Sequence, residues 1–163
     1  MIHTECYVAK LELFQKTLPT AYFEVITRKQ YVPETPKQGH ILSPSWKLLM
    51  TAKREKWSYE QYAIALLHEW GLEFSYGFMD TRQPKNTVID KLHELYWISQ
   101  TQNLYLICTE SASYKCHREI VKALLLGWSP SRIIDYIHTH FDTLRAYPLP
   151  TEEGLLKARS VIV

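Results

Sequence analysis

Residues 104–126 constrain the fold more than any other part of the chain. The segment begins with an apolar run that ends at Cys108, continues through a polar loop, and then enters a helix with an apolar stripe. A strand that leads through a loop into a helix is the unit from which α/β proteins are built. Because such proteins bind ligands where strands end and helices begin, the segment predicts both a fold class and the position of a site.

The chain of 163 residues is long enough for one well-packed core and short for two independent domains. We therefore expect a single α/β domain over residues 1–163, a compact three-layer Rossmann-like fold with a small, mostly parallel sheet. Strands are expected over residues 2–6 and 21–27, which are rich in β-branched and aromatic residues. A helix over residues 7–18 connects them, and this β-α-β start favours a parallel pair.

Caps and apolar spacing predict the remaining elements. Ser45 and Ser58 are expected to cap two helices, and Gly127 is expected to end the helix that follows the polar loop. Two more helices are predicted over residues 88–100 and 129–137. The other predictions are loops over 28–44 and 77–86 and an edge strand over 160–163.

The charge and cysteine content exclude several classes of protein. Since 19 Lys and Arg stand against 17 Asp and Glu, the net charge of +2 is too small to predict nucleic-acid binding by itself. The three cysteines are an odd number, which argues against a disulfide scaffold and for a reducing compartment. No apolar run approaches the roughly 20 residues that a membrane span requires. We expect a soluble cytoplasmic protein with no membrane partner.

Five reactive side chains lie within eleven residues at the predicted strand-loop-helix junction. They are Cys108, Glu110, Cys116, His117 and Arg118. The last three fall where the backbone N–H groups of a new helix have no partner within the helix. Such amides attract phosphate, and an arginine can bind it through two hydrogen bonds. The junction therefore predicts a site for a nucleotide-like or other phosphorylated small ligand, or for the phosphates of a short nucleic acid.

Arg28 is expected at the same edge of the sheet, because it follows another predicted parallel strand. Outer candidates in the second predicted loop are Asp80 and Arg82. If the protein is an enzyme, Glu110 or His117 would transfer protons and Arg118 would stabilise developing negative charge. The sequence does not decide between an enzyme and a binding module.

Cys116 is the better candidate for a nucleophile. A thiol near a helix N-terminus and beside cationic groups is more readily ionised, whereas Cys108 is expected to emerge from a buried strand. His117 would act as the acid or base, oriented by Glu110. The opposing interpretation is that these cysteines are small core residues, as free cysteines commonly are.

A zinc site is the alternative to a site without a cofactor. The four potential ligands are Cys6, Cys108, Cys116 and His117, a set that tetrahedral zinc accepts. Two features oppose zinc: there is no Cys-x2-Cys pair, and the neighbours Cys116 and His117 are expected to point in different directions from a helix. We therefore expect no cofactor. A Cys108–Cys116 disulfide would have to be a redox device in a reducing compartment.

The competing interpretation is a non-catalytic nucleic-acid-binding or accessory module. Aromatic rings beside basic side chains are how proteins hold single strands. The sequence offers Tyr31, Trp46, Trp57, Tyr59 and Tyr76 near Lys29, Lys37, Lys47, Arg54 and Lys56. In an accessory module, a structural polar lock would be formed by Cys108, Glu110, Cys116, His117 and Arg118.

The spacing of these reactive residues resembles a family signature. The pattern Cys108-x-Glu110-x5-Cys116-His117-Arg118 is similar to the Cys-x-Glu and Cys-His-Arg motifs of the domain-of-unknown-function 488 family. Further matches occur upstream in the family's order: Thr4, Tyr7 and Lys10, then Thr27-Arg28, then a Leu-Ala-Pro-Ser-like block at residues 42–49 with Lys53. The likeness covers about residues 2–126, and residues 127–163, expected to form a C-terminal helix and tail, have no counterpart.

The resemblance implies a compact Rossmann-like fold and no established reaction. It adds Thr4, Tyr7 and Lys10 to the predicted ligand-binding residues, which also include Arg28, Arg82 and Cys108. One departure from the family is the loop at residues 111–115, which lacks the Pro or Gly associated with its members.

Overall fold

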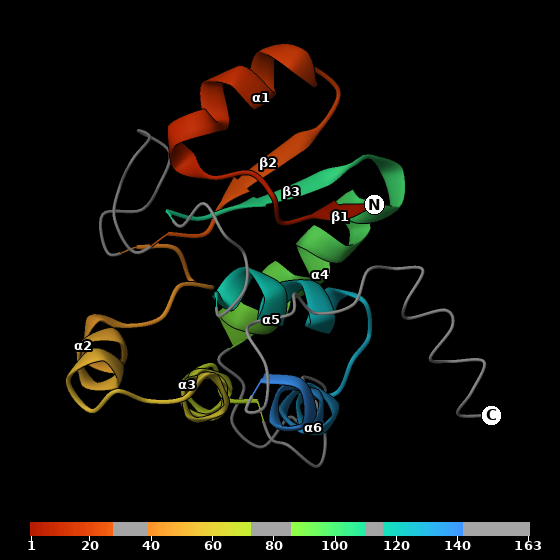
Figure 1. Ribbon diagram of the computed structural model, residues 1–163. Coiled ribbons are helices and arrows are strands. Elements are labelled where there is room, and N and C mark those ends of the chain that lie inside the picture. Colours follow the sequence, from red (N-terminus) through yellow and green to blue (C-terminus); the bar gives the residue numbers. More distant parts are fainter. Residues whose placement is uncertain (28–38, 73–85, 110–115, 142–163) are drawn as a thin grey trace.

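The structure is a computed structural model that describes residues 1–27, 39–72, 86–109 and 116–141 (Figure 1). Within these residues it has a mixed α/β fold, in which helices pack around a three-stranded parallel sheet. The strands are β1 (Ile2–His3), β2 (Tyr22–Val25) and β3 (Leu104–Ile107). The helices are the short 3-10 helix η1 (Val8–Lys10), followed by α1 (Leu11–Thr17), α2 (Trp46–Arg54), α3 (Tyr59–Glu69), α4 (Asn86–Thr101), α5 (His117–Leu125) and α6 (Pro130–Phe141).

The strand order is β1-β3-β2, and both outer strands run parallel to β3. Ile2 and Tyr22 both align with Leu104 in the register of the sheet. The parallel direction of the first two strands is as expected, but the prediction that they form a pair is wrong, because β3 lies between them. All four residues of β3 are buried, and a strand that is apolar on both faces is best accommodated at the centre of a sheet.

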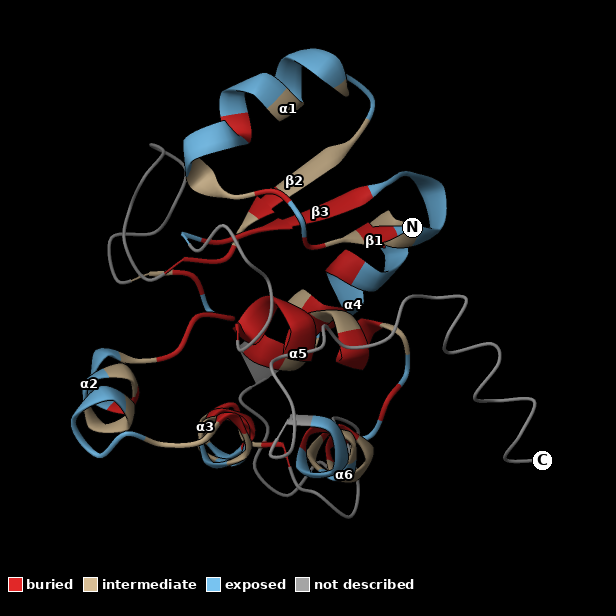
Figure 2. Ribbon diagram, viewed as in Figure 1, coloured by how far each residue is buried: buried red, intermediate tan, exposed pale blue. Residues whose placement is uncertain are grey.

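Successive side chains of β3 belong to two different apolar clusters. Leu104 and Leu106 pack in the main core, which is formed largely by residues of α3, α4, α5 and α6. Tyr105 and Ile107 pack with Leu11 of α1 in a smaller cluster. Figure 1 shows the corresponding arrangement, with α1 on one side of the sheet and α4 and α5 on the other. Helices therefore cover both faces of the sheet, and Figure 2 shows that burial is most continuous in β3 and α5.

The predicted helix starts at Ser45 and Ser58 are confirmed. The Ser45 hydroxyl accepts a hydrogen bond from the Leu48 N–H, and the same serine donates from its own N–H and hydroxyl to the Glu69 carboxylate. Ser58 and Gln61 form a reciprocal capping box at the start of α3. Gly127, with φ of 85°, follows the end of α5 as expected, since glycine adopts this conformation without steric cost.

Several predictions lie outside the described residues. These are the edge strand over 160–163, most of the two predicted loops, and the side chains of Arg28, Asp80, Arg82 and Glu110. Among the helices in the described part of the chain, none combines the length and the apolar character that crossing a membrane would require.

Candidate functional site

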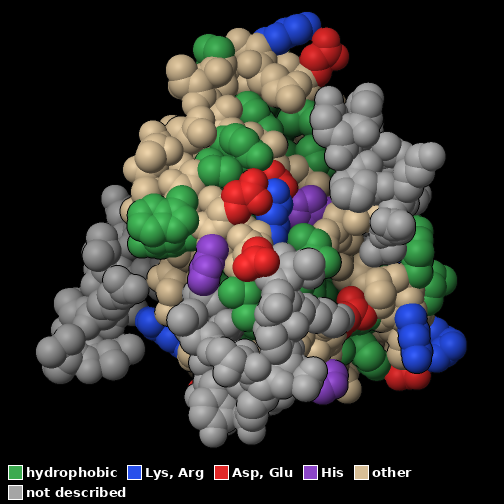
Figure 3. All heavy atoms as spheres, turned by 180° about the vertical axis from the view of Figure 1, so that it is seen from behind, with side chains coloured by type: hydrophobic (Ala, Val, Ile, Leu, Met, Phe, Trp, Pro, Cys, Tyr) green, Lys and Arg blue, Asp and Glu red, His purple; other side chains and the backbone are tan. Residues whose placement is uncertain are grey.

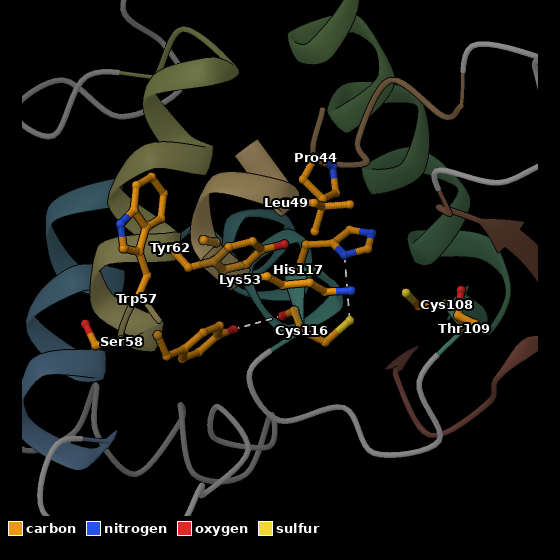
Figure 4. Close-up of a pocket in the computed structure, with 12 residues that line it drawn as sticks. Pro44, Leu49, Lys53, Trp57, Ser58, Tyr62, Cys108, Thr109, Cys116 and His117 are labelled. Carbon is orange, nitrogen blue, oxygen red and sulfur yellow. Dashed lines mark hydrogen bonds between the residues drawn. The ribbon is translucent and has the colours of Figure 1, made fainter. Parts of the chain in front are cut away.

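A cavity of about 310 Å³ lies where the end of β3 and the start of α5 meet helices α2 and α3 (Figure 4). Its lining residues are the apolar Pro44, Leu49 and Ala52, the aromatic Trp57, Tyr59 and Tyr62, the polar Lys53, Ser58 and Thr109, and the cluster Cys108, Cys116 and His117. The cavity is therefore at the strand-loop-helix junction that the sequence predicted as a site. Two of its walls come from helices that are distant from this junction in the sequence.

Cys108, Cys116 and His117 form a compact cluster at one end of the cavity. One potential metal-binding atom from each residue lies within 4.8 Å of the others. The Cys116 sulfur is 3.7 Å from His117 Nδ1, and His117 Nε2 is 2.5 Å from the backbone carbonyl oxygen of Ile26. Since a carbonyl oxygen only accepts hydrogen bonds, Nε2 carries a proton, and Nδ1 is the ring nitrogen that faces the Cys116 sulfur.

Cys116 and His117 come together because Cys116 is the N-cap of α5 and not a residue of the helix. Its backbone is extended, with φ of −118° and ψ of 148°, so its side chain leaves the chain in a different direction from that of a helical residue. The expectation that these neighbours point apart is therefore wrong. The Tyr59 hydroxyl donates to the Cys116 carbonyl oxygen at 2.8 Å, which ties this N-cap to α3.

The pKa values of the buried thiols Cys116 and Cys6 are shifted in opposite directions. A hydrogen bond from Cys108 contributes most to holding the pKa of the Cys116 thiol well below its usual value; burial opposes this, and His117 and Arg118 reinforce it. Burial raises the pKa of Cys6 to about 11. The Cys6 sulfur is directed to the carbonyl oxygen of Tyr7 and is not one of the three ligand atoms of the cluster. The Cys3His set that the sequence offered as an alternative is therefore reduced to Cys108, Cys116 and His117.

Arg118 is not among the described residues that line the cavity. It is fully buried and donates to the carbonyl oxygen of Cys6 at 2.7 Å. The next residue, Glu119, is also buried and accepts a 2.5 Å hydrogen bond from the Thr4 hydroxyl. Arg118 and Thr4, both predicted to touch ligand, are thus engaged in joining the N-terminal segment to the first turn of α5.

The other predicted site residues have different positions. Tyr7 is partly buried and forms a parallel bridge with Cys108, next to the 3.0 Å hydrogen bond from Val8 N–H to the Cys108 carbonyl oxygen. Lys10 is exposed at the end of η1 and is not among the described lining residues. Arg28, Arg82 and Glu110 lie outside the described residues.

Sequence reasoning did not assign Lys53 and Tyr62 to the site. Lys53 lies in the last turn of α2, and in Figure 4 its side chain extends into the cavity toward the cluster. The available signal was spacing: Leu49 and Lys53 are four residues apart, and Tyr59 and Tyr62 are three apart, so each pair shares one face of its helix.

Comparison with known proteins does not assign the chain to a family. A scan against protein-family models finds no match, and searches of curated proteins and of solved structures find none either. The resemblance to the domain-of-unknown-function 488 family therefore stays a prediction, and function must be argued from the geometry of the site.

Two kinds of chemistry are compatible with the cluster. Two sulfur atoms and one imidazole nitrogen at this separation could hold a metal ion. A thiol with a lowered pKa at a cavity wall is also a competent nucleophile, with His117 in reach to exchange a proton.

Proposed function

We propose that the cavity binds a nucleotide-like or other phosphorylated small ligand. The observation that carries this proposal is the composition of the walls: the ammonium group of Lys53 and the N-terminus of α5 border the same space as the rings of Trp57 and Tyr62. A cation and a helix N-terminus attract a phosphate, while aromatic rings offer a surface on which a flat base can stack. One cavity thus offers a positively charged wall for the phosphate of a nucleotide and an aromatic wall for its base.

The size of the cavity supports a small ligand. Ligand sites commonly measure about 300–1,000 Å³, and a volume of about 310 Å³ lies at the lower end of that range. This favours a mononucleotide or a sugar phosphate over a larger cofactor.

The distribution of charge gives less support to the nucleic-acid alternative. Figure 3 shows the face of the molecule opposite to the one in Figure 1. On the described part of this face, Lys and Arg side chains are separated and interspersed with Asp and Glu. Nucleic-acid-binding surfaces instead gather basic side chains along one stripe or patch. Among the residues that the sequence offered for stacking and phosphate contact, Trp57 and Tyr59 line the cavity. Trp46 and Lys47 are exposed on α2 and are not among the described residues that line it.

The accessory-module alternative is supported for only part of the predicted polar lock. Arg118 is fully buried and hydrogen-bonded to backbone, as a structural lock requires. Cys116 and His117, by contrast, line the cavity as well as contacting each other. A structural role predicts that a variant loses stability, and a role in the cavity predicts that it loses ligand binding. Measuring both quantities on variants of Arg118, Cys116 and His117 distinguishes the two roles.

Replacing Lys53 tests the proposal directly. Binding of adenosine 5′-monophosphate, ribose 5-phosphate and inorganic phosphate would be measured by calorimetry, with the folded state checked by circular dichroism. Because a hydrogen bond to a charged group contributes roughly 1.5 kcal/mol, we expect Lys53→Gln to raise Kd for the phosphorylated organic ligands about tenfold. Lys47→Gln on the same helix is the matched control and should leave Kd unchanged. Equal effects of the two variants, or no binding of any probe at millimolar concentration, would contradict the proposal.

We also propose that the described elements form a small Rossmann-like fold related to the domain-of-unknown-function 488 family. The support is the parallel sheet with helices on both faces, together with a signature whose Cys108, Cys116 and His117 gather at one site. An experimental structure that places the remaining residues would test this, and a further strand antiparallel to β3 would argue against it.

A further inference from the structure

We propose that Cys108, Cys116 and His117 form a zinc-binding site with three protein ligands and a fourth position open to the cavity. The ligand atoms are the two Sγ atoms and His117 Nδ1. This inference goes beyond the proposed phosphorylated ligand and does not depend on it, because the three ligands come from the protein alone.

The separations of the ligand atoms fit tetrahedral zinc. With Zn–S bonds of about 2.3 Å and Zn–N bonds of about 2.0–2.1 Å, neighbouring ligand atoms in a tetrahedron lie roughly 3.5–3.8 Å apart. The Cys116 sulfur and His117 Nδ1 are already 3.7 Å apart, and all three atoms lie within 4.8 Å of one another. Small side-chain rotations would therefore bring the ligands around one ion.

The surroundings of the ligands hold them in the required orientation. The bond between His117 Nε2 and the Ile26 carbonyl fixes the ring and leaves Nδ1 as the coordinating atom, an arrangement common around metal-binding histidines. The Tyr59 hydroxyl holds the Cys116 backbone, and the Val8 N–H holds the backbone of Cys108. All three ligands are thus fixed by contacts from separate segments of the chain.

The chemistry of the ligands selects the metal. Two thiolates and an imidazole suit zinc and are poor ligands for magnesium or calcium, which prefer oxygen. Each thiol releases its proton to solvent as its sulfur binds, so that the charge of the ion is balanced by two thiolates. Because all three ligands also line the cavity, the fourth position faces open space, where water or an anionic group could complete the tetrahedron. Three protein ligands with one open position are typical of catalytic zinc sites, whereas structural sites use four.

Cys6 provides a matched control. It is a buried cysteine in the same protein, but its sulfur is directed to the Tyr7 carbonyl and lies outside the cluster. The experiment uses the full chain, purified under reducing conditions and stripped of metal with a chelator. Zn²⁺ affinity would be measured in competition with a chromophoric chelator, and Co²⁺ would be added separately to record its absorption spectrum.

We expect one equivalent of Zn²⁺ per chain for the wild-type protein and for Cys6→Ala. Cys108→Ala and Cys116→Ala should each weaken binding at least tenfold, and His117→Gln should do the same. Co²⁺ in the wild-type protein should show the sulfur-to-metal charge-transfer bands and intense visible bands of a tetrahedral thiolate site.

Three results would overturn the inference. They are no stoichiometric Zn²⁺ binding by the reduced wild-type protein, a Co²⁺ spectrum without sulfur-to-metal bands, and a loss of affinity in Cys6→Ala equal to that in Cys116→Ala. The first two need no variant, so they hold even if a substituted protein fails to fold. Since the probe is the metal ion alone, failure here leaves the Lys53 test of phosphate binding unaffected.

Discussion

Arg118 shows how a single residue can join distant parts of the chain without touching the cavity. It is the largest fully buried side chain among the described residues, and its guanidinium donates to the carbonyl oxygen of Cys6. Burying a cation lowers the stability of the fold unless the cation is hydrogen-bonded. The Cys6 carbonyl oxygen accepts such a bond from Arg118 and would lack this donor without it. The residue therefore positions the N-terminal segment against α5.

Replacing Arg118 should lower the stability of the protein. Arg118→Met keeps much of the side-chain volume but removes the donor to Cys6, and we expect it to lower the free energy of unfolding by about 2–4 kcal/mol. Urea denaturation followed by circular dichroism would measure the change. Arg54→Met, at an exposed position of α2, is the control and should change stability by no more than about 0.5 kcal/mol. If both variants are equally stable, the buried hydrogen bond does not contribute as argued.

At the scale of elements, β3 and α5 together create the site. β3 is buried on both faces and ends at the cavity, and α5 begins there with Cys116 as its N-cap. Because both elements are buried in the main core, the packing of the core fixes their relative position. The packing of β3 and α5 in the core therefore also fixes the positions of Cys108, Cys116 and His117.

Truncating a side chain at the centre of β3 tests this dependence. Leu106 is fully buried in the main core, so Leu106→Ala should lower the free energy of unfolding by about 3 kcal/mol through lost burial and the cavity left behind. Leu13 is 54% exposed on α1, and Leu13→Ala should cost less than about 0.5 kcal/mol. Comparable losses from the two variants, measured by urea denaturation, would show that β3 is not the centre of the core.

At the scale of the whole molecule, a buried ionic group connects the sheet to two other segments. Glu24 of β2 lies 2.6 Å from His40 and 2.8 Å from Lys91 of α4. Burial alone would raise the pKa of the Glu24 carboxyl, but hydrogen bonds from His40 and Lys91 outweigh it and lower the pKa from 4.5 to about 2. The folded state thus favours the ionised carboxylate more than the unfolded chain does.

This lowered pKa predicts how stability depends on pH. The contribution of Glu24 is fully present above its unfolded pKa of 4.5 and is lost as pH falls toward the folded value of about 2. Glu24→Gln should therefore lower the free energy of unfolding by roughly 2–3 kcal/mol at pH 7, and the difference from wild type should shrink steadily between pH 5 and pH 2. Urea denaturation at a series of pH values would measure it.

The control for this experiment is Glu12→Gln. The Glu12 side chain is 85% exposed and pairs with Lys16 on the surface of α1, so its loss should have little effect at any pH. A difference between Glu24→Gln and wild type that stays constant from pH 7 to pH 2 would show that the carboxylate's charge is not the stabilising feature.

Much of the local structure could be predicted from the sequence. The apolar run before Cys108, the serine caps at Ser45 and Ser58, and the helix end at Gly127 are signals carried by neighbouring residues, and each is confirmed. The position of a cavity at the strand-loop-helix junction follows from the same local reasoning. Such signals are readable because caps, turns and apolar periodicity depend on residues only a few positions apart.

Only the tertiary structure decided which distant segments meet. It placed β3 between β1 and β2, directed Arg118 to the Cys6 carbonyl, and brought Lys53 of α2 to the cavity. It also brought the Cys116 sulfur beside His117, through an extended N-cap that periodicity alone did not reveal. The sequence by itself determined the kinds of element and the residues at their ends. The packing of both faces of β3 determined the neighbours, because burying apolar surface depends on the whole chain and not on any one window of it.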